Sequence, residues 1–335
     1  MTNTDAPREG GRPVSYSELD TFRQCPLKWQ IGYAQGWKPE REKEAFRLGH
    51  VWHSIMETHY STIKELQQAE QERTGKAVSP YRGSKAETTW LELCAREVGY
   101  AVMDTLDDET RELMEWAYSG YVELHGCDPD WRIIATEQKG EVPLAPGARP
   151  LVWVIDLVVE DLSYGGVWIV DHKFPGDLAS DVEIDLDDQL GLYWFAWGIS
   201  GHELAARVNG AMLNEARKKR NKGDLPGAIA EWERVKAAGG KPGVKPKAQT
   251  LEQRFRRTRT SRTAEELTTI AEDALQVVRA METGIIYSSP NPKQCAWKCD
   301  FREQHILARS SGLPLTEVLE DFGFRSRAMR EAEGA

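Results

Sequence analysis

The stretch LVWVIDLVVEDLSYGGVWIVDHKF, residues 151–174, decides the fold. Two runs rich in Val and Ile flank a Gly-containing turn, which is the composition of a β-hairpin. A hairpin that turns at Tyr164–Gly165 pairs residues whose numbers sum to about 329. In that register Asp156 faces Lys173, and Asp171 lies diagonally on the same face because strand side chains alternate.

Two aspartates in such apolar strands are costly to bury unless a cation joins them. One interpretation is a structural salt bridge between Lys173 and one aspartate. The other is a magnesium site for phosphodiester hydrolysis, in which the aspartates bind the ion and Lys173 acts on the attacking water. An isolated Asp-x-Lys favours the salt bridge, so the surrounding sequence has to decide.

Two helical segments carry further polar residues at helical spacing. Gln189 and Tyr193 are four residues apart, and Gly49, His53 and Glu57 repeat at the same interval upstream. A lone helical His or a Gln/Tyr pair more often belongs to ordinary packing than to a site. These residues gain weight only in combination with the hairpin.

Around the hairpin, the periodicity predicts helices, then a β-meander, a helix, a strand and a last helix. Helices are expected at 15–36, 46–72, 85–119 and 263–284, and the fold class is mixed α/β: a core sheet flanked by helices, with helical additions at both ends. We expect a disordered lead-in over 1–14, one domain over 15–310 and a tail over 311–335. Within the domain the parts are 15–120 (mainly helical), 131–214 (catalytic core), 215–262 (basic flexible insertion) and 263–310 (helix and Cys/His segment).

Charge is unevenly distributed. The chain of 335 residues has a net charge of -10, yet residues 217–262 hold 15 Lys and Arg against 4 Asp and Glu. This stretch is either a solvated loop or a basic flap that neutralises phosphates. No apolar run reaches the length of a membrane span, and the polar N-terminus is unlike a signal peptide, so a cytoplasmic location is expected.

Five cysteines at irregular spacing do not indicate a secreted disulfide framework. Near the C-terminus QCAWKCDFREQH, residues 294–305, places Cys295, Cys299 and His305 at a spacing that supplies three ligands of a metal or cluster site. Such a site normally needs a fourth.

Taken together, these motifs resemble the PD-(D/E)xK nuclease superfamily, in particular its RecB-like exonuclease branch. The matching elements are Gly49-x-x-x-His53, Asp156 in its strand, the tripeptide Asp171-His172-Lys173 and Gln189-x-x-x-Tyr193. The opening SYSELDTFRQCPLKW, residues 15–29, is similar to the N-terminal helix of that branch. Five weak motifs in the family's order make a fairly specific set.

The resemblance implies a role for each matching residue. Asp156 and Asp171 would bind Mg²⁺ or Mn²⁺ with the main-chain carbonyl of His172, and His53 would complete the metal shell. Lys173 would serve the attacking water and the transition state. Gln189 and Tyr193 would position DNA and the active-site helix. Glu137 on the preceding strand is a secondary candidate near the metal.

Members of this branch, including AddB-type subunits and exonucleases of CRISPR adaptation modules, carry a [4Fe-4S] cluster. The resemblance assigns Cys25, Cys295 and Cys299 to three of its ligands, and His305 takes the position of the last cysteine. The same four groups would also suit Zn²⁺, or the site has decayed. Cys94 and Cys127 are expected to be buried thiols.

The resulting hypothesis is a Mg²⁺- or Mn²⁺-dependent DNA exonuclease that serves recombination, repair or end processing. A phage-encoded enzyme that is active in the host cytoplasm is one form of this hypothesis. Tryptophans and the basic stretch would contact DNA ends or single strands. The alternative is a catalytically silent module of the same fold that binds DNA ends or a partner protein. The intact set of Asp156, Asp171 and Lys173 favours the enzyme.

Overall fold

The computed structural model describes residues 12–40, 44–75 and 85–333. Most of the expected lead-in, up to residue 11, lies outside these residues. The chain divides into two structural units: unit 1 comprises Met1–Glu44, Gly140–Trp153 and Ala264–Ala335, and unit 2 comprises Ala45–Lys139 and Val154–Thr263. None of the helices in the described part of the chain has the length and apolar composition of a membrane span.

Unit 2 holds most of a sheet and the helices around it. Its α-helices are α3 (Glu44–Thr74, which starts one residue before the unit), α4 (Lys85–Ala101), α5 (Asp108–His125), α6 (Asp181–Asp185), α7 (Asp188–Ile199), α8 (Ala228–Ala237) and α9 (Leu251–Arg254). Short 3₁₀ turns are η2 (Val102–Thr105), η3 (Ala205–Arg207) and η4 (Lys222–Asp224). The strands are β3 (Trp131–Val142), β4 (Leu151–Asp161), β5 (Val167–Lys173), β6 (Val208–Ala216) and β7 (Phe255–Thr260), of which β3 and β4 extend into unit 1.

The strands form a mixed sheet in the order β1-β4-β5-β6-β7, and β3 also pairs with β4. Strands β4 and β5 are antiparallel, β5 and β6 parallel, and β6 and β7 antiparallel. A mixed α/β fold with a sheet flanked by helices is therefore confirmed.

The predicted hairpin register is wrong by two residues. Leu157 pairs with Val170 and Glu160 with Val167, so partner numbers sum to 327. The connection is longer than expected because the Asp161 carboxylate accepts the backbone N–H groups of Ser163 and Tyr164. Two glycines at positive φ, Gly165 (90°) and Gly166 (81°), then return the chain to β5. A shift by two preserves side-chain alternation, so Asp156, Asp171 and Lys173 keep their common face.

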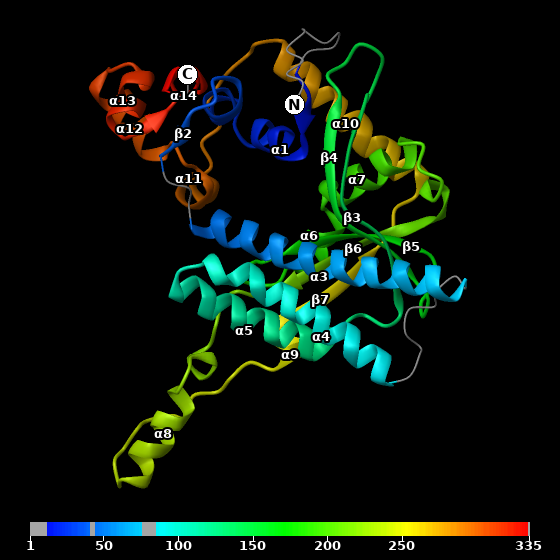
Figure 1. Cartoon of the computed structure of the whole chain (residues 1–335). Helices are drawn as coiled ribbons and strands as arrows, with labels where there is room; N and C mark the ends of the chain where they lie inside the picture. The colour runs from blue at the N-terminus through cyan, green and yellow to red at the C-terminus, as the bar shows by residue number, and fades with distance from the viewer. Residues whose placement is uncertain (1–11, 41–43, 76–84, 334–335) are drawn as a thin grey trace. The chain divides into compact units, whose positions relative to one another are not determined.

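One face of this sheet carries an apolar core beneath α3, α4 and α5, and Figure 1 shows α3 running across the strands with α4 and α5 beside it. The sheet contributes alternate residues of each strand, such as Leu157 and Val159 of β4 and Val170 of β5. From α3 the core receives Trp52, Ile55, Met56, Tyr60 and Ile63. Helix α7 packs against β5 and β6. Its Gln189 contacts Asp171, whose side chain points to the face opposite to that of the core residue Val170.

Unit 1 combines both ends of the described chain with a short segment from its middle. It contains β1 (Val14–Ser15), α1 (Tyr16–Gln24), α2 (Pro26–Trp29), the π-helix η1 (Gln30–Ala34), β2 (Lys38–Pro39), α10 (Ala264–Glu282), α11 (Pro292–Lys298), α12 (Arg302–Ser311), α13 (Leu315–Asp321), β8 (Phe324–Arg325) and α14 (Arg327–Glu333). The expected tail after 311 thus forms α13, β8 and α14. Strand β1 pairs with the start of β4, and β2 pairs with β8.

Two expected helices are interrupted at residues that favour the end of one helix or the start of another. The segment 15–36 breaks at Cys25, which is extended (φ -163°, ψ 106°), as favoured before Pro26. The segment 85–119 breaks before α5, where the Asp107 side chain accepts the N–H of Thr110 and caps a new helix. The long helix expected over 46–72 is confirmed as α3.

The C-terminal boundary of the basic flexible insertion expected over 215–262 is wrong, because β7 lies within that range and belongs to the sheet. Its arginines pair with buried carboxylates: Arg256 with Glu215, Arg257 with Asp128 and Arg259 with Asp161. Arg257 binds both oxygens of Asp128, at 2.5 and 2.9 Å, and Tyr60 donates to the same carboxylate at 2.7 Å. A fully hydrogen-bonded buried pair of this kind becomes very unfavourable when one partner is lost.

We therefore expect Asp128→Asn to lower the free energy of unfolding by about 3–5 kcal/mol at neutral pH, because it leaves Arg257 buried without a counter-charge. Burial alone raises the pKa of Asp128, but Arg257 outweighs it and the net pKa is lowered. The stabilisation is therefore present above the ordinary pKa of an aspartate and is lost as the pH falls through the depressed value. Urea unfolding at pH 7 and pH 3 measures the difference.

The matched control for this prediction is Glu231→Gln, which removes the exposed pair between Glu231 and Arg234 and should leave the unfolding midpoint unchanged. Equal effects of the two substitutions would contradict the account of the buried pair.

Candidate active site

The end of β5 carries the tripeptide that the sequence singled out. Asp171 and Lys173 lie on one face, and the Lys173 Nζ is 2.7 Å from the Asp171 Oδ2. Between them His172 points to the core, where its ring stacks on Tyr60 at 5.4 Å between centroids. Asp171 is nearly inaccessible, with 6% of its side chain exposed, whereas 34% of the Lys173 side chain is exposed. The lysine therefore lies at the boundary between the buried carboxylate and solvent.

Helix α7 delivers Gln189 to this pair. The Asp187 side chain caps the helix by accepting the backbone N–H groups of Gln189 and Leu190, which fixes the first turn next to β5. The Gln189 Nε2 donates to Asp171 Oδ1 at 3.3 Å, and its Oε1 accepts from Lys173 at 3.3 Å. The amide thus holds both charged groups in place.

Tyr193 follows one turn later on the same face of α7. Burial raises the pKa of Tyr193 to about 12, with a further contribution from the charge of Asp171, while a hydrogen bond with Gln189 opposes the shift. The phenol is therefore neutral at physiological pH, and its hydroxyl lies beside the amide that bridges Asp171 and Lys173.

Asp156 lies on β4, and continuing the observed register by one pair places it opposite Asp171. Its Oδ2 accepts the backbone N–H of His172 at 2.7 Å and lies 3.2 Å from the His53 Nδ1 of α3. This bond ties the Asp156 carboxylate to the β5 backbone between the two other charged residues. The helix expected to carry His53 and the strand expected to carry Asp156 thus meet at one point.

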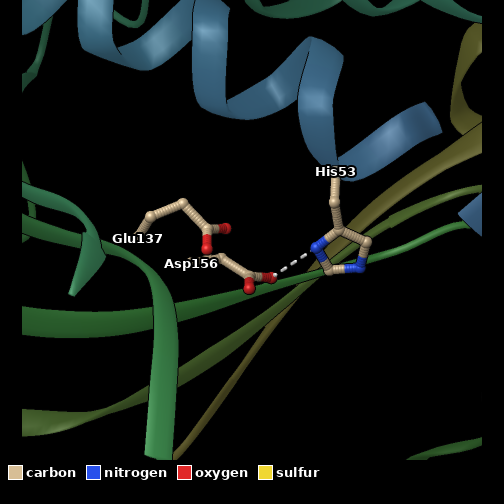
Figure 2. A group of neighbouring side chains, drawn as sticks. All are labelled: His53, Glu137 and Asp156. Atoms are coloured by element: carbon tan, nitrogen blue, oxygen red, sulfur yellow. Dashed lines mark ion pairs between the residues drawn. The ribbon is translucent and has the colours of Figure 1, made fainter. Parts of the chain in front are cut away.

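Glu137 completes a group of three ligand-bearing side chains with His53 and Asp156. One ligand atom from each lies within 4.8 Å of the others. Figure 2 shows the carboxylates of Glu137 and Asp156 side by side, with the His53 ring approaching Asp156 from α3. Glu137 has a φ of 45° inside β3, a backbone conformation uncommon for residues other than glycine and often associated with functional sites.

The charges at this site shift one another. Burial, aided by the charge of Asp156 and opposed by Lys173, raises the pKa of Asp171 to about 6. Burial also acts to raise the pKa of Asp156, but its bond to His53 outweighs that effect and the net pKa is lowered. For His53 and Lys173 burial lowers the pKa, yet the neighbouring carboxylates dominate and raise both. The adjacent carboxylates of Asp156 and Asp171 would therefore be stabilised by additional positive charge.

The donor set fits a divalent ion. Carboxylate oxygens suit Mg²⁺ and Mn²⁺, and an imidazole nitrogen shifts the preference toward Mn²⁺. Burial together with Asp156 and Glu57 raises the pKa of Glu137, which indicates that negative charge already accumulates around it. Divalent-metal binding is thus consistent with the residues present, which are His53, Glu137 and Asp156, with Asp171 beside Asp156.

On the core side of β5, Asn214 makes a polar contact that was not predicted from the sequence. The Asn214 Nδ2 of β6 donates to the His172 Nδ1 at 2.9 Å and to the Tyr121 hydroxyl at 2.6 Å. Burial lowers the pKa of His172 to about 3, so the ring is neutral and accepts this bond. The signal in the sequence was a polar Asn at the end of the stretch GAMLN, residues 210–214.

The cysteines expected to bind a cluster lie in unit 1. Cys25, Cys295, Cys299 and His305 all line one cavity of about 340 Å³. The Cys25 Sγ accepts the backbone N–H of Ser289 at 3.5 Å. Among the described residues, however, no three of these four groups bring their ligand atoms within 4.8 Å of one another. Of the remaining thiols Cys127 is buried, as expected, and Cys94 is half-buried.

We predict that His53→Ala weakens Mn²⁺ binding about tenfold or more, and Mg²⁺ binding less, because only the imidazole favours the softer ion. Isothermal titration of the DNA-free protein with each metal measures both affinities. His50→Ala, an exposed position three residues earlier on α3, serves as control and should change neither. Equal losses for His53→Ala and His50→Ala would show that His53 is no ligand.

Comparison with known families agrees with this geometry. A model of the PD-(D/E)XK nuclease superfamily matches residues 13–304, which is most of the chain and includes every residue of the site. No curated protein matches the sequence. Members of this superfamily are generally metal-dependent nucleases that act on nucleic acids. The chain belongs to the PD-(D/E)XK nuclease superfamily.

Proposed function

We propose that the protein is a DNA exonuclease that uses Mg²⁺ or Mn²⁺ to hydrolyse phosphodiester bonds at DNA ends, in recombination, repair or end processing in the cytoplasm. The observation that carries this proposal is the convergence of Asp156, Asp171 and Lys173 with His53 and Gln189. These groups come from β4, β5, α3 and α7, four elements that unit 2 brings to one place. A merely structural ion pair would need only one aspartate and the lysine.

Asp156, Asp171, His53 and Glu137 would hold the divalent ion, with the His172 carbonyl as a further ligand. When bound, such an ion supplies a water of lowered pKa and stabilises negative charge on the phosphate. The lysine then has a defined task. Because the carboxylates raise its pKa, Lys173 stays protonated at neutral pH and donates a hydrogen bond to the attacking water or to a phosphate oxygen.

Gln189 and Tyr193 are positioning residues in this proposal. Gln189 holds the ion pair of Lys173 and Asp171 in a fixed orientation, because its amide bonds to both residues. A cavity of about 510 Å³ borders Lys173 and Asp187 and gives space for a strand beside them. At Gly49, one turn before His53, an added Cβ would meet no described atom within 4 Å, so packing does not require glycine there. We infer that the open space beside Gly49 admits the substrate backbone near His53.

The enzymatic proposal is tested with end-labelled linear DNA and closed circular DNA in Mg²⁺ or Mn²⁺. We expect release of nucleotides from the linear substrate alone, and a fall of about a hundredfold to a thousandfold in Asp171→Asn and in Lys173→Ala, because each removes charge that acts on the transition state. Asp181→Asn and Lys38→Ala, at exposed positions, are the matched controls.

If the unmutated protein is no more active than the two site variants, the nuclease proposal fails. Binding of DNA ends without hydrolysis would instead support the catalytically silent module. Cleavage of circular DNA would identify an endonuclease.

We also propose that the cavity lined by Cys25, Cys295, Cys299 and His305 holds a [4Fe-4S] cluster. A single Zn²⁺ would draw its ligands within about 4 Å of one another, whereas a cluster of several ions separates them further. The cavity volume of about 340 Å³ supports the larger group. Burial and Arg309 lower the pKa of His305, so its imidazole is neutral and able to bind metal.

The cluster is tested by the absorption spectrum of anaerobically purified protein. We expect a shoulder near roughly 400 nm that dithionite bleaches, its loss in Cys25→Ser and Cys299→Ser, and its retention in the control Cys94→Ser. A colourless protein with stoichiometric zinc, or one with neither metal, would contradict the cluster proposal. A cluster that survives in His305→Ala would exclude only the histidine ligand.

A further inference from the structure

Residues 217–249 form an arm that leaves the sheet after β6 and returns at α9. It contains η4 and α8, and Figure 1 shows α8 projecting away from the strands and helices of unit 2. No residue of α8 is buried. The arm therefore contributes nothing to the apolar core of unit 2, and its presence calls for another explanation.

The arm is nonetheless internally ordered by polar contacts. At its base the Arg217 backbone N–H donates to the Arg254 carbonyl at 2.8 Å, and the Gln249 N–H donates to Asp224 Oδ1 at 2.9 Å. Near its tip the Trp232 Nε1 donates to the Gly243 carbonyl at 3.0 Å, which joins α8 to the returning chain. An ordered arm that has no apolar core of its own is suited to expose a binding surface to a partner molecule.

That surface is strongly basic. Between Arg217 and Gln249 the sequence has ten Lys and Arg against three Asp and Glu. The carboxylates of α8 are already neutralised, Glu231 by Arg234 and Glu233 by Lys245. Among the described residues, no carboxylate lies within 4.0 Å of the ammonium groups of Lys218, Lys222, Lys236, Lys241 and Lys247. These five lysines therefore have no carboxylate counter-charge within the described part of the chain and can bind an anionic partner.

The arm begins beside the candidate active site. Asp177, which pairs with Arg217 and Lys219 at the arm's base, lines the same cavity of about 510 Å³ as Lys173. The other carboxylates of that cavity are engaged as well: Glu215 pairs with Arg256, Glu183 caps its own helix and Asp187 caps α7. A polyanion that has one phosphate bound at Lys173 would therefore meet the positively charged side chains of the arm if it extends in that direction.

The arm offers charge but no aromatic platform. Its single aromatic residue is Trp232, whose ring is covered by Lys236 and Lys245 at 5.0 and 5.6 Å. Proteins that bind single-stranded nucleic acid usually stack its bases on free aromatic rings. Lysines instead recognise phosphates as point charges. This chemistry favours the sugar-phosphate backbone of a duplex, irrespective of sequence.

We propose that the arm binds the phosphate backbone of duplex DNA next to the bond that is cut. The proposal rests on the nuclease function in identifying the ligand as DNA. Ten residues of α8 span about 15 Å, which corresponds to about four base pairs of a duplex. The arm would hold the double-stranded part of the substrate while its end lies at Asp156, Asp171 and Lys173.

The test uses the full chain carrying Lys173→Ala, so that DNA is bound and not cut. Fluorescence anisotropy with a labelled 30-base-pair duplex measures Kd from 50 to 300 mM salt. The arm variant combines Lys222→Gln, Lys236→Gln, Lys241→Gln and Lys247→Gln. We expect Kd to rise about tenfold or more at 100 mM salt and the slope of log K against log salt to fall by about 3 to 4, because each lost phosphate contact lowers the slope by nearly one.

The matched control carries the same loss of charge on other helices and strands: Lys38→Gln, Lys64→Gln, Arg96→Gln and Arg279→Gln. It should bind within about twofold of the parent, and arginine at the four arm positions should restore binding. Equal weakening in arm variant and control, or unchanged binding in the arm variant, would overturn the proposal. A preference of the arm for single-stranded DNA or for an acidic protein over the duplex would overturn it as well.

A second readout separates this proposal from the nuclease proposal. In the chain with Lys173 intact, the arm variant should hydrolyse the small diester bis(p-nitrophenyl) phosphate at the parental rate while it loses activity on long duplexes. If the parent hydrolyses neither substrate, the nuclease proposal fails, yet the binding comparison still decides the role of the arm.

Discussion

The constraint on which this structure depends is the cost of burying Asp156 and Asp171 on adjacent strands. Two carboxylates in an apolar sheet repel each other and lose hydration. Each is therefore tied to specific partners: Asp156 to His53 and the His172 backbone, Asp171 to Lys173 and Gln189. Even so, the pKa of Asp171 remains raised to about 6. Such incomplete compensation is consistent with a site that binds a divalent cation.

A polar layer on the core side of β5 keeps this arrangement rigid. His172 receives a hydrogen bond from Asn214 of β6 and stacks on Tyr60 of α3. Tyr60 in turn donates to Asp128, which Arg257 of β7 binds through both oxygens. The backbone between the two charged residues of β5 is thus anchored to elements far apart in sequence. Stability of the sheet and geometry of the site come from the same set of contacts.

Local sequence patterns sufficed for the mixed α/β class, for α3 and for the shared face of Asp156, Asp171 and Lys173. They failed where distant residues decide. The hairpin register depends on how the Asp161 side chain bonds within the turn, and β7 was mistaken for flexible sequence because the carboxylates that neutralise its arginines lie at positions 128, 161 and 215. Glu137 was only a secondary candidate, since neither its positive φ nor its proximity to Asp156 is visible in sequence.

The central claim is that the buried carboxylates form a metal site and not a structural salt bridge, and thermal unfolding without DNA at pH 8 tests it most directly. Mn²⁺ should raise the Tm of the unmutated protein, because it binds the folded state alone, and Asp171→Asn should abolish that rise. In EDTA, at a pH above the raised pKa of Asp171, the neutral Asn should be no less stable than the charged Asp. A variant that is destabilised in EDTA, together with an unmutated protein whose Tm ignores Mn²⁺, would contradict the claim.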